Sequence, residues 1–153
     1  MIHVNSYLRA KGNEFIPVSD VLEPPRNPRH VEGAIDLTVN GVCIIDKTLW
    51  DDVDQLWAYM SDMVLALNNS NESSTFSPDQ PIKLTFRRLK AGNILISLTF
   101  DDVRRSVSAN EASFIFALQQ SGQEFFHKLK KLLPENAPGY DDALERLAAY
   151  KVP

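Results

Sequence analysis

The fold of this chain is decided by AIDLTVNGVCII, residues 34–45, in which two alternating runs of apolar residues flank Asn40-Gly41. Asn-Gly between such runs predicts a β-hairpin, because both central residues of a type I′ turn need positive φ angles, which Asn and Gly tolerate. A two-residue loop also fixes the register of the hairpin, and the period of two gives it one apolar face. The expected cross-strand pairs are Val39 with Val42 and Leu37 with Ile44.

A long amphipathic helix is predicted directly after the hairpin, over residues 48–68. Asp46 or Thr48 can cap its first turn by accepting a hydrogen bond from a free backbone N–H. Apolar residues recur every three or four positions, and Trp50 and Trp57 make the stripe wide enough to cover a face of a sheet. The stripe consists of Leu49, Val53, Leu56, Met60, Met63 and Leu67.

The same two periodicities predict the rest of the fold. Short turns join the last three expected strands, which indicates an antiparallel meander. We therefore predict one α+β domain over residues 1–153, with an antiparallel sheet of about five to six strands packed against two main helices and a short C-terminal helix. The further strands are expected near 1–8, 15–16, 82–87, 94–100 and 103–107, and the further helices over 110–133 and 140–150.

Two long connections interrupt this pattern. Prolines recur between residues 17 and 30 and exclude regular structure over most of that segment. A proline-rich connection of this length is typical of a binding loop or of an ordered segment wrapped around the domain. A second, Asn- and Ser-rich linker is expected over 68–81, with Phe76 holding it against the surface.

The predicted helix over 110–133 carries two further signals. Ser108 and Glu111 have the spacing of a capping box, in which each side chain satisfies a backbone N–H at the helix start. Gly122 lies in mid-helix, where glycine costs about 1 kcal/mol relative to alanine. It therefore indicates either close packing at that point or a break into two helices.

Composition and charge restrict the class of protein. The chain has 153 residues, 44% of them hydrophobic, which suits one globular domain with a sizeable core. A formal net charge of −4 gives no support to general nucleic-acid binding through a basic surface. Cys43 is the only cysteine, so an intramolecular disulfide is excluded and a reducing, cytoplasmic location is expected. The sequence shows no secretory pattern at its N-terminus and no apolar run as long as a membrane span.

No catalytic, cofactor or metal site is predicted. His3, His30 and His127 are scattered, whereas zinc sites usually take two ligands from close in sequence. General acid–base pairs need carboxylates that converge on one cleft, but the three acidic pairs fall where helix starts and turns favour Asp. These pairs are Asp51-Asp52, Asp101-Asp102 and Asp141-Asp142.

Two arginine pairs flank the predicted meander, and their role is left open. If Arg87, Arg88, Arg104 and Arg105 meet on one sheet face, they can bind an anion. The alternative is that they are solvated edge charges, which discourage sheet edges from aggregating.

A resemblance to a known class of proteins rests on three features. They are the run from Leu37 to Asp46, Trp50 and Trp57 in the helix behind it, and Phe125-Phe126 near the C-terminus. In size, acidity and layout, residues 34–133 resemble small immunity proteins of bacterial polymorphic and contact-dependent toxin systems. The resemblance implies a non-catalytic protein that binds and neutralises one cognate toxin. Two other hypotheses stay open: a small enzyme that uses scattered carboxylates or His127, and a structural or assembly subunit.

Acidic side chains gather on the polar side of the first predicted helix. Asp51 and Asp62 are eleven residues apart, about three helical turns, so they can share one stripe, which Asp52 and Asp54 broaden. None of the four is expected to be buried. Such a surface can steer and occlude a basic cleft, so the stripe is the predicted partner-binding site and a basic, nuclease-type toxin domain is the predicted partner. The alternative is an ordinary solvated helix face.

Overall fold

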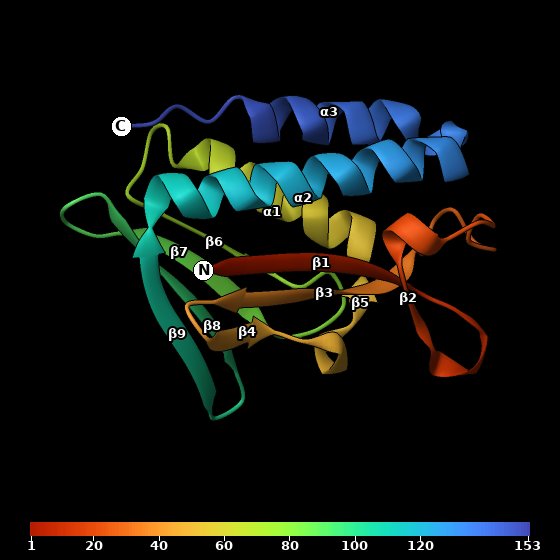
Figure 1. The fold of residues 1–153 in the computed structure, drawn as a ribbon, viewed down its shortest axis with the longest axis horizontal. Helices are drawn as coiled ribbons and strands as arrows, with labels where there is room; N and C mark the ends of the chain where they lie inside the picture. The colour runs from red at the N-terminus through yellow and green to blue at the C-terminus, as the bar shows by residue number, and fades with distance from the viewer.

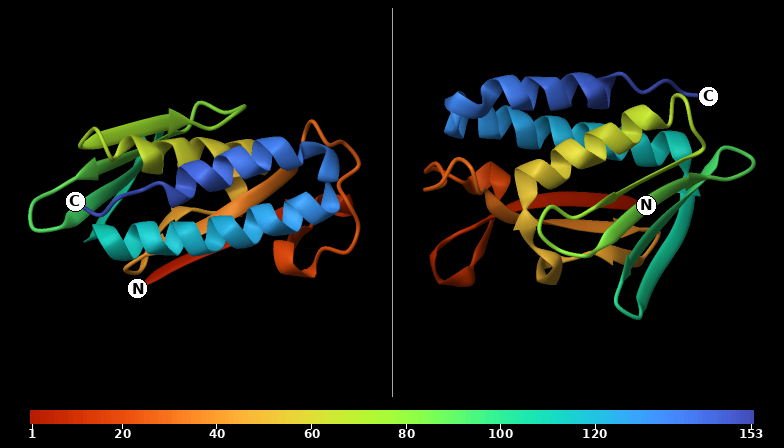
Figure 2. Two further views of the ribbon diagram at one scale, coloured as in Figure 1. Left: turned by 90° about the horizontal axis from the view of Figure 1, so that it is seen from above. Right: turned by 180° about the vertical axis from the view of Figure 1, so that it is seen from behind.

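The computed structural model describes residues 1–153 and confirms the α+β class. The strands divide between two antiparallel sheets, one of five strands and one of four, in place of the single sheet that we expected. Three helices lie together on one side of the five-stranded sheet, and the four-stranded sheet packs across one end of it (Figure 1 and Figure 2). None of the helices combines the length and the apolar character that crossing a membrane requires.

The predicted hairpin is present in the five-stranded sheet. It consists of β3 (Glu32–Val39) and β4 (Val42–Ile45), and Val39 lies opposite Val42 as predicted. The turn residues Asn40-Gly41 have φ angles of 49° and 82°, the positive values that this turn requires.

The register of the hairpin changes one step further from the turn. Thr38 lies opposite Cys43, but Leu37 lies opposite Ile45, so Ile44 is an extra residue in a β-bulge. The predicted pairing of Leu37 with Ile44 is wrong for this reason. Both Ile44 and Ile45 are buried, whereas a regular strand would turn one of two successive residues away from the core.

Three further strands complete the five-stranded sheet. They are β1 (Ile2–Arg9), β2 (Phe15–Pro17) and β5 (Asp51–Asp52). The order is β2–β1–β3–β4, with β5 paired to the start of β3. The first two strands confirm the prediction, and β5 lies where we expected the start of a helix.

The four-stranded sheet is a meander in chain order, formed by β6 (Glu72–Phe76), β7 (Lys83–Arg88), β8 (Asn93–Phe100) and β9 (Val103–Asn110). The last three strands confirm the prediction. β6 corrects it, because this strand lies inside the expected irregular linker. Its residues are mostly polar, so they show no apolar alternation, and the strand forms because its backbone pairs with β7. Phe76 is 58% exposed and does not hold this segment against the surface.

The three helices are α1 (Val53–Ala66), α2 (Glu111–Leu132) and α3 (Ala137–Ala148). α1 begins later than predicted, because Asp46 caps a 3₁₀ turn at Lys47–Leu49 and β5 follows that turn. Three other 3₁₀ turns lie at Lys11–Asn13, Val18–Asp20 and Pro134–Asn136.

The start of α2 differs from the predicted capping box. Asn110 caps the helix, since its side-chain oxygen accepts a 2.9 Å hydrogen bond from the N–H of Ser113. Ser108 lies in β9, and the carboxylate of Glu111 is paired with the guanidinium of Arg88. The capping-box prediction is therefore wrong.

Gly122 lies where the three helices pack closely together. A Cβ atom added there would lie 2.6 Å from Cδ2 of Leu147 and 3.0 Å from the ring of Trp57. α2 continues through this residue, so close packing is confirmed and the break into two helices is not observed. The Trp57 ring also packs on Phe125 and Phe126, with centroid distances of 6.1 and 6.5 Å.

Candidate functional site

The four aspartates of the predicted partner site do not form one exposed stripe. Asp51 and Asp52 are only 4% and 6% exposed and belong to β5, so the expectation that none is buried is wrong. Asp54 is half-buried at the start of α1. Asp62 is exposed on α1, where its carboxylate forms a 2.6 Å ion pair with Arg146. The helix therefore offers a partner little unpaired negative charge.

Asp51 fastens the segment before β7 to β5. Its two carboxylate oxygens accept hydrogen bonds of 3.2 and 3.1 Å from the N–H of Asp79, and one of them also accepts from the N–H of Asp52. The carboxylates of these three residues lie within 4.8 Å of one another, so they are the chain's candidate ligands for a cation. Hydrogen bonds from backbone donors already explain the burial of the Asp51 carboxylate without a cation.

Two of the four aspartates of the predicted partner site, Asp52 and Asp54, have a raised pKa. Burial raises the pKa of Asp52, and this effect outweighs the hydrogen bond from His30 at 3.4 Å. Burial also raises the pKa of Asp54, whose carboxylate accepts a 2.8 Å hydrogen bond from the hydroxyl of Tyr140. The shift of Asp54 reflects the packing of α1 against α3, whereas that of Asp52 reflects its burial in β5.

Replacement of Asp54 by Asn is expected to gain in relative stability as the pH rises. Because the folded pKa of Asp54 is raised, its contribution to stability is present below the unfolded pKa and is lost as the pH rises through the folded pKa. Asn carries no charge at any pH, although it loses one of the two acceptor oxygens that serve Gln55 and Tyr140. Urea unfolding of both proteins from about pH 3.5 to 7 measures the trend. The exposed Asp142→Asn is the control, and a difference that moves against Asp54→Asn as the pH rises would contradict the expectation.

The four arginines around the meander divide between the two faces of the sheet. Arg88 turns toward the helices and bonds Glu111 through Nε and Nη2 at 2.7 and 2.9 Å. Arg105 donates 3.2 Å hydrogen bonds to the carbonyl of Ile44 and to the carboxylate of Asp46. Both of these cations are neutralised inside the chain. Arg87 and Arg104 lie on the opposite face, so the four do not gather into one anion site.

That opposite face, which we call the outer face, is largely polar, and most of its residues are exposed or half-buried, although Ser97 is buried. It faces away from the helices, which pack on the other side of the sheet (Figure 1 and Figure 2). Strand pairing aligns its side chains in three rows, the middle one made only of hydroxyl residues. The rows are Ser74-Thr85-Ser97-Ser106, Phe76-Lys83-Thr99-Arg104 and Glu72-Arg87-Leu95-Ser108.

The outer face is cationic although the chain as a whole is acidic. It carries Lys83, Arg87 and Arg104 against a single carboxylate, Glu72, in a chain of net charge −4. All four residues are exposed, and none of them forms an ion pair. Unpaired cations beside rows of hydroxyls can bind carboxylates or phosphates on a flat partner surface.

The sequence contained part of the signal for the outer face. Alternation in β7 shows that Lys83, Thr85 and Arg87 share a face. It does not show which residues of β6, β8 and β9 stand beside them, because those neighbours depend on the register between strands.

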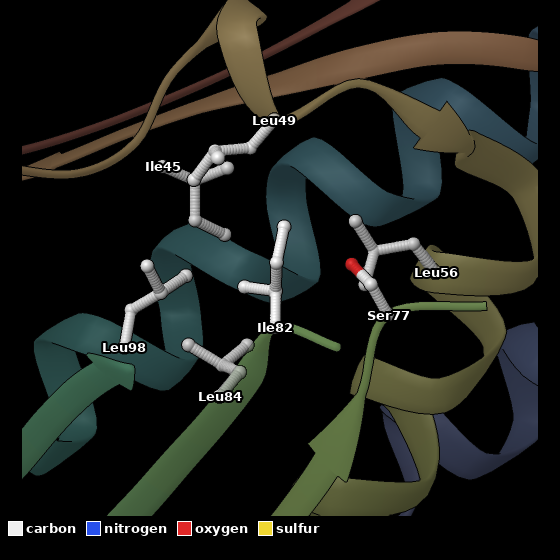
Figure 3. Close-up of a pocket in the computed structure, with 7 residues that line it drawn as sticks. All are labelled: Ile45, Leu49, Leu56, Ser77, Ile82, Leu84 and Leu98. Carbon is white, nitrogen blue, oxygen red and sulfur yellow. The ribbon is translucent and has the colours of Figure 1, made fainter. Parts of the chain in front are cut away.

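The small cavity between the two sheets is part of the core. The centre of a water molecule can occupy about 10 Å³ of this cavity, which is close to the smallest volume that holds one water. Figure 3 shows that its lining side chains are apolar except for one serine. They are Ile45, Leu49, Leu56, Ser77, Ile82, Leu84 and Leu98.

Comparison with known protein families, curated protein sequences and solved structures finds no match for this chain.

Proposed function

We propose that this chain is a non-catalytic binding protein that neutralises a cognate bacterial toxin by direct binding, in the manner of the immunity proteins that it resembles. The observation that carries the proposal is the outer face of the four-stranded sheet. It spans four strands, and it presents Lys83, Arg87 and Arg104 exposed and without ion pairs. Charged surfaces of one sign favour fast and selective association with a surface of the opposite sign.

The partner surface that fits this face is acidic. Arginine binds carboxylates through two parallel hydrogen bonds, and the flanking hydroxyls can donate to the same groups. This chemistry differs from the basic partner that the aspartates of the first helix led us to expect. Those aspartates are engaged with other parts of the chain, whereas the three cations are free.

The contacts of the least exposed carboxylates also favour a binding protein over an enzyme. The carboxylate of Asp54 accepts a hydrogen bond from Tyr140, and that of Glu111 accepts hydrogen bonds from Arg88 and Tyr150, so both carboxylates hold elements of the fold together. A general acid or base has to reach a substrate in an accessible cleft. The cavity between the sheets is apolar and small, so it brings no carboxylate toward a substrate.

Co-expression with the product of the adjacent upstream gene tests this proposal. The neighbour is expected to be toxic, and the chain is expected to protect the cell and to bind the neighbour directly. The combined Lys83→Glu, Arg87→Glu and Arg104→Glu variant is expected to bind about tenfold more weakly or worse at low salt, because like charges then face each other.

The matched control carries the same change of charge on other surfaces, as Lys11→Glu, Lys131→Glu and Lys151→Glu, and is expected to protect as the original chain does. A harmless neighbour, or a chain that fails to protect, contradicts the proposed function. Equal loss of binding in the variant and the control would assign the effect to net charge and not to the outer face.

A further inference from the structure

β6 is an edge strand of the four-stranded sheet. The hydrogen bonds at its two ends show which of its residues pair with β7. At one end, the N–H of Arg88 donates to the carbonyl of Asn71 at 2.7 Å. At the other end, the N–H of Ser77 donates to the carbonyl of Ile82 at 2.8 Å. Bonding alternates along an antiparallel strand, so the odd-numbered residues of β6 turn their backbone groups to β7. The even-numbered residues turn theirs to the open edge.

Three backbone groups on this edge have no hydrogen-bond partner. They are the N–H and the C=O of Ser74 and the N–H of Phe76. The hydroxyl of Ser70 donates to the carbonyl of Glu72 and accepts from its N–H. The hydroxyl of Thr75 donates to the carbonyl of Phe76. An edge with such unpaired groups is ready to accept another strand.

The edges at β9 and β2 are less open to a second strand. β9 runs beside β4, where Arg105 donates to the carbonyl of Ile44 and the side-chain amide of Asn40 donates to the carbonyl of Ser108. β2 is only three residues long and ends at Pro17. β6 contains no proline, no lysine and no bulge, the devices that commonly discourage edge pairing.

We propose that β6 pairs antiparallel with β6 of a second copy of this chain, about a two-fold axis through Ser74. Because Ser74 offers both an N–H and a C=O, the two copies can exchange two hydrogen bonds there. In the same register, the N–H of Phe76 reaches the carbonyl of Glu72 in the second copy. The two four-stranded sheets then become one sheet of eight strands, with a continuous outer face.

The charges on the outer face fit this register. Pairing puts Glu72 of the second copy beside Phe76, in the row that contains Lys83. Strands lie about 4.8 Å apart, so two strand spacings, about 10 Å, separate the backbones of Lys83 and the incoming Glu72. Both side chains are long enough to meet across Phe76, and neither has an ion pair in the single chain. No two like charges face each other directly across the new strand pair.

The surface beside this edge is formed by α1, which contacts β6 through a hydrogen bond from the hydroxyl of Ser73 to the carbonyl of Met63. A groove of about 270 Å³ separates β6 from α1. The carboxylate of Asp62 on this side is already paired with Arg146, so an approaching copy of α1 brings no unpaired acidic group from that position. The groove is lined by Tyr59, Asp62, Met63, Ala66, Ser73, Ser74 and Thr75.

The first test is the mass of the protein in solution, measured by sedimentation equilibrium from roughly 10 µM to 1 mM, where weak self-association is visible. The mass is expected to rise from 17.3 kDa toward twice that value. Ser74→Pro is expected to weaken the association by about tenfold or more, because proline has no N–H to donate. Its fold is expected to survive, since the lost N–H faces the open edge and not β7. Ser74→Thr keeps the N–H and is expected to associate as the original chain does.

The second test does not depend on proline being tolerated. In a Cys43→Ser background, which removes the exposed native cysteine, Ser74→Cys places two thiols across the two-fold axis. Residues that form such a hydrogen-bonded pair have Cα atoms about 5.5 Å apart, within the range of a disulfide. Mild oxidation is expected to cross-link this variant several-fold faster than Ser106→Cys, the matched control on β9.

Three results would overturn the proposal. One is a constant mass of 17.3 kDa up to the highest concentration, which would leave the β6 edge to a strand of a different protein. Another is equal association of the Ser74→Pro and Ser74→Thr variants, which would move the interface elsewhere. The third is cross-linking at Ser74 no faster than at Ser106. None of these results bears on toxin neutralisation, so this proposal and the proposed function fail separately.

Discussion

Arg88→Ala is expected to lower the free energy of unfolding by about 3–5 kcal/mol, because it leaves the buried carboxylate of Glu111 without its cationic partner. Glu111 is 3% exposed, and two nitrogens of Arg88 donate to its oxygens at 2.7 and 2.9 Å. The hydroxyl of Tyr150 donates to the same carboxylate, so the pair also holds the C-terminal segment to the start of α2. Urea unfolding at pH 7 measures the loss.

The same pair gives this loss a dependence on pH. The hydrogen bonds from Arg88 lower the pKa of Glu111, so the stability that they contribute is present above the unfolded pKa of Glu111. It is lost as the pH falls through the folded pKa, and the difference between the Arg88→Ala variant and the original chain is expected to shrink in acid.

Arg87→Ala is the matched control for this prediction. Arg87 is the preceding residue of the same strand, but it lies on the outer face and forms no ion pair. Its replacement is expected to change the free energy of unfolding by no more than about 0.5 kcal/mol. Similar losses for the two variants would show that strand propensity, and not the buried pair, sets the effect.

Trp57→Ala is expected to lower the free energy of unfolding by about 3–5 kcal/mol, because it leaves a cavity in the core. Trp57 is completely buried where α1 meets α2, packs on Phe125 and Phe126, and lies against Gly122. Its indole N–H also donates to the hydroxyl of Ser6 at 2.9 Å, which would lose its partner. Thermal and urea unfolding measure the change.

Trp50→Ala separates the loss of a core residue from the loss of an aromatic ring. Trp50 is half-buried before β5, where the guanidinium of Arg9 lies 4.1 Å from its ring centroid. Its replacement is expected to cost about 1 kcal/mol. Equal losses for the two tryptophans would contradict the assignment of Trp57 to the centre of the core.

The sequence treats these two tryptophans alike, and the structure separates them. Both fit the apolar period of a helix over 48–68, which is a local property. Asp46 caps a 3₁₀ turn, and Asp51-Asp52 pair with the start of β3, so the helix begins only at Val53. That pairing joins residues distant in the chain, and no local pattern contains it.

The predicted placement of the four aspartates on one helix face was wrong for the same reason. Helical spacing placed Asp51 and Asp52 on a polar helix face, but their backbone belongs to a strand. The segment containing Asp79 then folds over Asp51 and donates its N–H to the carboxylate. Burial of these side chains is a consequence of that contact and cannot be read from residues 46–68 alone.

The sequence by itself determined the α+β class, the Asn40-Gly41 hairpin, the meander and the three helices. These features depend on positive φ angles at a turn and on apolar residues that recur every 2 or 3.6 positions. Both are properties of residues close together in the sequence. Only the tertiary structure decided β6, the bulge at Ile44, the partner of Glu111 and the rows of the outer face. β6 is polar along most of its length, so its ladder with β7, and not an apolar pattern, makes it a strand. The rows arise from register, because the identity of a residue fixes its chemistry while strand pairing fixes its neighbours.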